Sequence, residues 1–175
     1  MARWVWLGSF FFLSIPALVF YEKSTFSQKE PYYLSPVLSP SNNLTLRRDT
    51  YGKGYFGASR SGRRTHAGID LTAAVGSPVI ASKSGRVFFA GDDAGYGRYV
   101  EIHHPDGLLT RYAHLSEIRV KEGEWVYQDQ VIGASGKTGN ANQSSIIPHL
   151  HFEIRYQNQP LNPASGLLDP KIHIH

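Results

Sequence analysis

The stretch from Pro148 to Arg155, Pro-His-Leu-His-Phe-Glu-Ile-Arg, constrains the fold of this chain more than any other. Polar and apolar residues alternate with a period of two, which predicts a β-strand with one apolar and one polar face. The polar face carries His149, His151 and Glu153. Two imidazoles two residues apart on a strand project side by side, so one can ligate a metal while the other moves protons beside it. A solvated strand face is the alternative interpretation.

A second imidazole and a carboxylate lie upstream, in His66-Ala-Gly-Ile-Asp70. The glycine, the isoleucine and the Leu-Thr that follows favour a loop running into a strand over a helix. Fully extended, the four-residue step spans about 13 Å, which is long for two side chains that share one ion. Gly68 can bend the chain between them. The alternative interpretation is an exposed loop histidine followed by an aspartate that caps a turn.

Combined, the two motifs predict a metal site. His66, Asp70 and one histidine of the pair His149/His151 form a nitrogen and oxygen ligand set, which suits zinc and leaves a fourth position open. The chain has no cysteine, so any metal must be held by histidine and carboxylate. Three protein ligands with an open position are typical of catalytic zinc rather than structural zinc.

The third motif runs from Val100 to Ser116 and contains His104, Gly107, Thr110, Tyr112 and His114. It predicts a hairpin that turns at Pro-Asp-Gly, with His114 at the far end of the returning strand. In this order, the three motifs resemble the M23 metallopeptidases, the lysostaphin-type or LytM-domain peptidoglycan endopeptidases. The resemblance covers about two thirds of the chain, roughly 51–163.

The resemblance assigns a role to each of five residues. His66, Asp70 and His151 match the zinc ligands of the family, and His149 and His114 match the two histidines that flank the water molecule which zinc activates. We expect His149 to act as the general base and His114 to stabilise the developing charge.

Other residues are interpreted more simply. Tyr112 and the loop 136–140 are expected to line the cleft, with simple packing of Tyr112 and a plain turn at 136–140 as the alternative interpretations. A His-Ile-His sequence at the chain's end mimics the strand motif but has no apolar strand after it. We place this pair, His173 and His175, outside the catalytic site. His103, on the hairpin strand, and His104, at its turn, are placed outside it as well.

The fold class follows from short β-like runs separated by Gly, Pro and Asp turns. No run shows the spacing of a long amphipathic helix, so we expect an all-β sandwich or barrel. The resemblance implies a small antiparallel β domain of the LytM, or duplicated hybrid motif-like, kind with an open groove. The predicted strands are 69–71, 78–81, 85–90, 99–103, 108–113, 130–133 and 150–156.

Four segments are predicted along the chain. Residues 1–21 start with Met-Ala-Arg and continue with an apolar run, as in a secretory signal. An uncleaved membrane anchor is favoured over a cleaved signal because no Ala-x-Ala-like site follows. Residues 22–48 are rich in Ser, Pro and Asn and indicate a linker, 49–165 form the zinc peptidase domain, and 166–175 are a tail.

The predicted function is zinc-dependent hydrolysis of peptide bonds in bacterial peptidoglycan stem peptides or cross-links, with D-Ala-diaminopimelate cross-links favoured. The enzyme is expected to be exported, in the periplasm or on the outer face of the inner membrane, or secreted if the signal is cleaved. The net charge of +4 suits an acidic wall, while scattered basic residues argue against nucleic acid as a partner. We expect a monomer.

Two alternatives remain open. The first is a catalytically silent LytM-type regulator of a cell-wall amidase, although such proteins typically lack the zinc ligands that this chain keeps. The second is a carrier or wall-anchoring module, suggested by a faint echo between 75–79 and 121–126. A carrier would need an exposed lysine at a hairpin tip, and none stands out.

Overall fold

The structure is a computed structural model that describes residues 24–39, 43–60, 62 and 64–175. The predicted signal or anchor at 1–21 lies outside these residues. Among the helices of the described part of the chain, none is long and apolar enough to cross a membrane.

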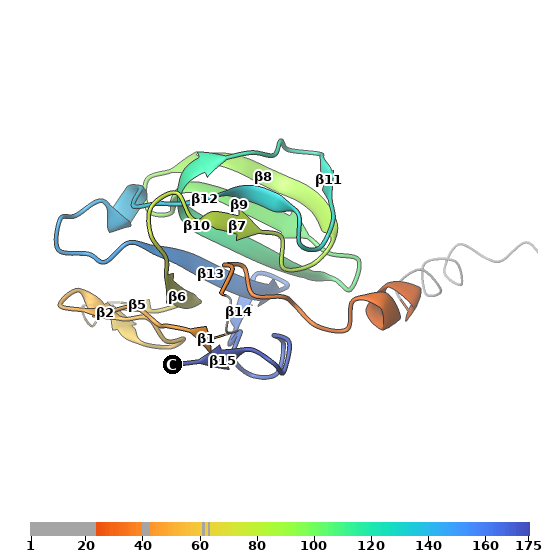
Figure 1. Cartoon of the computed structure of the whole chain (residues 1–175), viewed down its shortest axis with the longest axis horizontal. Helices are drawn as coiled ribbons and strands as arrows, with labels where there is room; N and C mark the ends of the chain where they lie inside the picture. Colours follow the sequence, from red (N-terminus) through yellow and green to blue (C-terminus); the bar gives the residue numbers. More distant parts are fainter. Residues whose placement is uncertain (1–23, 40–42, 61, 63) are drawn as a thin grey trace, which may run out of the picture.

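Nine strands form one antiparallel sheet, which dominates the molecule (Figure 1). The other regular structure includes a short helix at 24–29 and the 3₁₀ turn η1 (Gly139–Ala141). The strands of the large sheet are β6 (Ile69–Thr72), β7 (Pro78–Ile80), β8 (Gly85–Asp93), β9 (Gly97–His103), β10 (Leu108–Ile118), β11 (Trp125–Val126), β12 (Val131–Ser135), β13 (His149–Tyr156) and β14 (Gln159–Leu161).

Three further pairs of strands form separate two-stranded sheets. All seven strands predicted from the sequence are present, with ends that differ by a few residues, and the all-β antiparallel fold is confirmed. The short strands were not predicted, because two-residue pairings leave no periodic pattern. They are β1 (Asn43–Leu44) with β15 (His173–Ile174), β2 (Arg48–Asp49) with β3 (Gly52–Lys53), and β4 (Ser59–Arg60) with β5 (Arg64–Thr65).

The sheet forks along β10. The main path runs β11-β8-β9-β10-β12-β7, and β13 pairs with β10, β6 and β14. The first part of β10, as far as Ala113, pairs with β13, whereas the part from Leu115 onward pairs with β12. Figure 1 shows β13 and β6 below the strands β7 to β12. His114 therefore stands at the fork, between the two branches of the sheet.

Alternation along β13 places its apolar residues in the core. Leu150, Phe152 and Ile154 are all fully buried, as the period of two predicts. The opposite face is also buried: His149, His151 and Glu153 are 3%, 6% and 0% exposed. This polar face is therefore not a solvated strand face.

The described part of the predicted linker packs on the domain. Tyr33, Val37 and Leu44 belong to the hydrophobic core. The carboxylate of Glu30 accepts hydrogen bonds from the backbone N–H and the hydroxyl of Ser84. The division into linker, peptidase domain and tail stays a prediction, but these contacts tie the residues before position 49 to the sheet.

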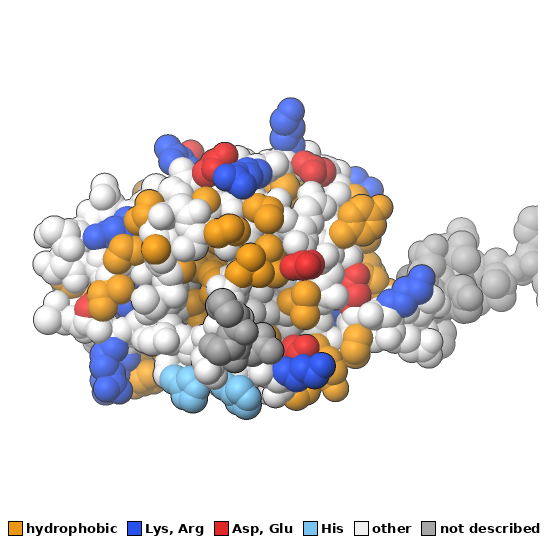
Figure 2. Space-filling model, in the orientation of Figure 1, with side chains coloured by type: hydrophobic (Ala, Val, Ile, Leu, Met, Phe, Trp, Pro, Cys, Tyr) orange, Lys and Arg blue, Asp and Glu red, His pale blue; other side chains and the backbone are white. Residues whose placement is uncertain are grey.

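The face of the molecule drawn in Figure 2 carries its charges in a dispersed pattern. On the face drawn in Figure 2, Lys and Arg side chains lie apart from one another near the margin, and hydrophobic side chains gather nearer the middle. The dispersal matches the scattered basic residues of the sequence.

Candidate metal centre

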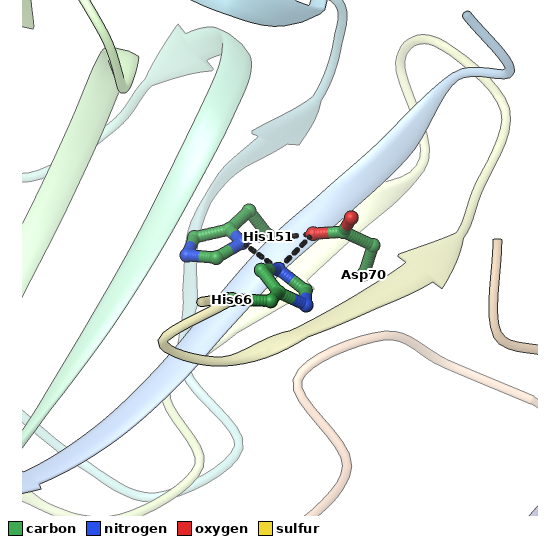
Figure 3. A group of neighbouring side chains, drawn as sticks. All are labelled: His66, Asp70 and His151. Carbon is green, nitrogen blue, oxygen red and sulfur yellow. Dashed lines mark hydrogen bonds and ion pairs between the residues drawn. The ribbon is translucent and has the colours of Figure 1, made fainter. Parts of the chain in front are cut away.

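Three side chains from two strands and the loop before β6 converge on one point (Figure 3). Nδ1 of His151 on β13 lies 2.8 Å from Oδ1 of Asp70 on β6. Nε2 of His66, just before β6, lies 2.9 Å from the same oxygen and 3.0 Å from Nδ1 of His151. All three residues are buried. The bend predicted at Gly68 thus brings His66 and Asp70 together.

The bend requires glycine at position 68 because there is no room for a side chain there. A Cβ atom at this position would lie 2.2 Å from the carbonyl oxygen of Phe152 and 2.9 Å from Cγ of Glu153. The loop between His66 and Asp70 therefore lies directly against the backbone of β13.

In His66 and Asp70, the nitrogen or oxygen atom that points away from the convergence point has hydrogen-bond partners of its own. Nδ1 of His66 lies 2.9 Å from the carbonyl oxygen of Tyr55, so that nitrogen carries the proton and Nε2 presents a lone pair. Oδ2 of Asp70 accepts hydrogen bonds from Arg47 (3.1 and 3.2 Å) and Arg60 (2.7 Å). The arginines leave Oδ1 to face the two imidazoles.

The ionisation of this group follows from its contacts. Burial raises the pKa of Asp70, but the contacts of its carboxylate with the imidazoles of His151 and His66 outweigh burial and hold that pKa well below its ordinary value. Burial lowers the pKa of His151, but its hydrogen bonds to Asp70 and Glu153 outweigh this effect and raise the pKa to about 9. Asp70 is therefore a carboxylate, the form that binds a cation.

Two more histidines lie beside the converging group. The rings of His114 and His149 are 5.1 Å apart, and the rings of His114 and His151 are 5.9 Å apart. Nδ1 of His149 donates to the carbonyl of Ile147 (2.7 Å), and Nδ1 of His114 to the carbonyl of Thr138 (2.9 Å). Both rings therefore keep Nε2 as a free acceptor.

Burial keeps these two imidazoles neutral. Desolvation lowers the pKa of His149, and burial together with the charges of His151 and His149 lowers the pKa of His114 to about 3. Near neutral pH each ring can accept a proton. Their roles as base and stabiliser stay predictions.

All five predicted site residues line one groove of about 610 Å³. Its other lining residues come from the segments 47–65, 95–96 and 140–146. Asn140 of the predicted 136–140 loop lines it, and Thr138 holds His114 from behind. Tyr112 does not line it: that side chain is fully buried, packs on Phe152 and accepts a hydrogen bond from the Ser82 N–H.

The histidines placed outside the site lie outside the groove lining. His104 is buried, with Nδ1 2.9 Å from the carbonyl of Ser84 and Nε2 2.8 Å from Oγ1 of Thr110. His103 stacks on Phe88. His173 lies in β15, which pairs in parallel with β1, so the chain's end is held by strand pairing.

The residues that sequence reasoning missed are the supports of the ligands. Arg47 and Arg60 hold Asp70, and Tyr96 donates its hydroxyl to Glu153 at 2.9 Å. No short motif links them to their partners, since each is more than nine positions away in sequence. Glu153 itself was visible only as a polar residue two positions after His151.

The donor set fits zinc. Two imidazole nitrogens and one carboxylate oxygen meet within a buried pocket, and Zn²⁺ favours this combination with three protein ligands in catalytic sites. His66, Asp70 and His151 would hold the ion.

Curated relatives share the domain but are much longer. "DD-carboxypeptidase/endopeptidase Mpg" of Neisseria meningitidis is 47% identical over 105 residues, which cover 60% of this chain and 23% of that protein. "Murein hydrolase activator NlpD" of Escherichia coli is 39% identical over 126 residues, covering 70% of this chain and 31% of that protein. The chain thus spans less than a third of the length of either relative.

Solved structures show the same fold. A zinc-containing peptidase from Vibrio cholerae superimposes with a TM-score of 0.63 at 29% identity, covering 80% of this chain and 41% of that chain. Lysostaphin from Staphylococcus simulans gives 0.58 at 31% identity, with 69% of this chain and 49% of that chain covered. The family model described as "Peptidase family M23" matches residues 64–163. This chain therefore belongs to peptidase family M23.

Proposed function

We propose that this protein is a zinc-dependent endopeptidase that hydrolyses peptide bonds in peptidoglycan. The observation that carries the proposal is the convergence of His66, Asp70 and His151 at a groove that also presents two neutral histidines. Zinc, when bound there, polarises a peptide carbonyl and lowers the pKa of a water molecule.

The chain's own residues supply the proton transfers. Nε2 of His149 lies 3.9 Å from Oδ1 of Asp70, so its lone pair faces the ligand group. As a neutral acceptor beside the reacting centre, His149 takes a proton from the attacking water and returns it to the leaving amine. His114, whose ring lies 5.1 Å from that of His149, supports the developing oxyanion as a hydrogen-bond donor once its Nε2 carries a proton.

The substrate class is a peptide of the cell wall. The groove has a volume of about 610 Å³, and the neisserial relative is named as a carboxypeptidase and endopeptidase of the DD type. We extend this to the D-Ala-diaminopimelate cross-link as the favoured bond. The location that goes with it is the periplasm or the outer face of the inner membrane, with the 1–21 segment as signal or anchor, and the protein acting as a monomer.

A second candidate is a regulator of a wall amidase. It is favoured by the similarity to NlpD, whose printed name is an activator of murein hydrolases. The full set of predicted ligands and both flanking histidines in this chain favour hydrolysis instead.

One experiment tests both candidates. The full-length chain in detergent is mixed with purified peptidoglycan containing diaminopimelate cross-links, and separately with pentaglycine-bridged peptidoglycan, with and without a zinc chelator. Mass spectrometry of the released fragments identifies the bond. We expect chelator-sensitive fragments from the first substrate. Intact walls in the presence of stoichiometric zinc would contradict the endopeptidase and favour the regulator.

A further inference from the structure

The ring of His151 is held from the side opposite the metal site by Glu153. We infer that Glu153 is a positioning residue: it fixes the tautomer and orientation of His151 so that Nδ1 presents its lone pair to the metal. The inference rests on the proposed zinc site and deepens it.

The two ring nitrogens of His151 face different groups. Nδ1 faces Asp70 and His66, and Nε2 lies 2.9 Å from Oε1 of Glu153. A nitrogen that ligates a metal must be unprotonated, so the proton of the neutral ring must be on the other nitrogen. A carboxylate accepts hydrogen bonds and cannot donate them, so Glu153 requires that proton on Nε2.

Both carboxylate oxygens of Glu153 are surrounded by donors. Oε1 receives the Tyr96 hydroxyl at 2.9 Å as well as His151. Oε2 receives Arg155 at 2.6 Å and Arg111 at 3.3 Å. Glu153 is 0% exposed, so nothing but these four donors can solvate it. Burial raises its pKa, but the hydrogen bond from His151 and the charges of His151 and Arg111 lower it to about 2.

The position of Glu153 is set by strand register rather than by a loop. Glu101 on β9, Arg111 on β10 and Glu153 on β13 are directly opposite one another across three strands. Arg111 donates to Oε2 of Glu101 at 2.6 and 3.1 Å, which directs its remaining nitrogen to Glu153. This row of alternating charges anchors the carboxylate on the same face of β13 as His151, two residues away.

Such an arrangement tolerates no neutral isostere. If Glu153→Gln turned its amide oxygen toward His151, its NH₂ group would point at the guanidinium groups of Arg111 and Arg155. If the amide flipped, its NH₂ group would face Nε2 of His151 and favour the proton on Nδ1. The first orientation leaves donors facing one another in a buried site, and the second leaves the proton on Nδ1, the nitrogen that must be unprotonated to ligate the metal. Metal binding should therefore weaken without any ligand being removed.

The first test measures zinc binding to the full-length chain in detergent by competition with a fluorescent chelator, and records the cobalt(II) absorption spectrum as a readout of ligand geometry. We expect Glu153→Gln to weaken zinc binding about 10- to 100-fold and to change the cobalt spectrum. The matched control is Glu117→Gln, an exposed glutamate near the end of β10 that pairs with Arg119. It should bind zinc like the wild type.

A folded Glu153→Gln protein with wild-type zinc affinity and an unchanged cobalt spectrum would overturn the inference. If that variant does not fold, Arg155→Gln removes one donor from Oε2 and leaves the carboxylate. It should give an intermediate loss of affinity, and no loss would equally overturn the inference. Nitrogen-15 NMR of the zinc-loaded wild type should show the proton of His151 on Nε2. Wild-type protein that binds no zinc would instead reject the proposed function itself.

Discussion

His151 and Asp70 are directly opposite each other in the antiparallel pairing of β13 with β6, and their facing atoms, Nδ1 and Oδ1, lie 2.8 Å apart. Strand register therefore fixes two of the three predicted metal ligands. A slip of one residue would turn one of them to the opposite face of the sheet. The hydrophobic set on β13 prevents that slip, because Leu150, Phe152 and Ile154 would lose their core contacts.

Substitution of the two histidines of β13 should have different effects on zinc binding and on activity. His151→Ala removes a ligand, so zinc and activity should both be lost. His149→Ala should keep one zinc per chain and lose about 10²- to 10⁴-fold in activity, because only the proton acceptor is removed. Metal content by mass spectrometry and fragment release from peptidoglycan measure the two effects. Loss of zinc from His149→Ala would show that the ligand assignment is wrong.

The His-Ile-His sequence at the chain's end should not matter for the metal site. His173 and His175 are exposed, and the strand that contains His173 pairs with β1. Replacing both with Ala should leave zinc stoichiometry and hydrolysis as in the wild type. The same two assays apply, and a defect in either would mean that this pair, rather than His151, holds the ion.

Zinc binding should release a proton from His151. Its pKa of about 9 in the metal-free protein means that the ring is protonated near neutral pH, and a metal ligand must be neutral. Zinc affinity should therefore rise about tenfold per pH unit until pH approaches about 9. Titration calorimetry in two buffers of different ionisation enthalpy counts the released protons. Equal apparent enthalpies in both buffers would contradict this prediction.

His104 should make the fold less stable in acid. Burial lowers its pKa from 6.5 to about 4, so the unfolded chain takes up a proton before the folded chain does. The contribution of neutral His104 to the free energy of unfolding is fully present above pH 6.5. It is lost as the pH decreases toward 4, by about 3 kcal/mol in total. Urea unfolding of wild type and His104→Gln across this range, with chelator present, isolates the effect. Parallel pH profiles for the two proteins would argue against it.

Gly68→Ala should damage both stability and zinc binding. Its Cβ would meet the carbonyl oxygen of Phe152 at 2.2 Å, so the loop that carries His66 must move away from β13. The control is Gly57→Ala, where φ is +78° but no atom lies within 4 Å of the added carbon. Gly57→Ala should lower the free energy of unfolding by about 1 kcal/mol, from backbone strain alone, and leave zinc affinity unchanged. Thermal unfolding and chelator competition separate the two variants.

Local sequence patterns were enough to predict seven strands of the large sheet and the residue types of the site. The period of two in 148–155 predicted which side of β13 is core, and the His-x-x-x-Asp motif with a central glycine predicted a bend before a strand. These features are local, because they depend on alternation and on the conformational freedom of one glycine. They sufficed to name His66, Asp70 and His151 once the family resemblance was added.

The direction of the His114 ring and the residues that support the ligands depend on how distant parts of the chain pack together. Strict alternation along β10 would place His114 on the core side with Tyr112. In the structure, its φ of +62° and a register shift between Tyr112 and Leu115 turn the ring toward His149 instead. Arg47 and Glu153 likewise gain their roles from chain segments that meet only on folding. Such contacts depend on strand order and register, which no single stretch of the sequence contains.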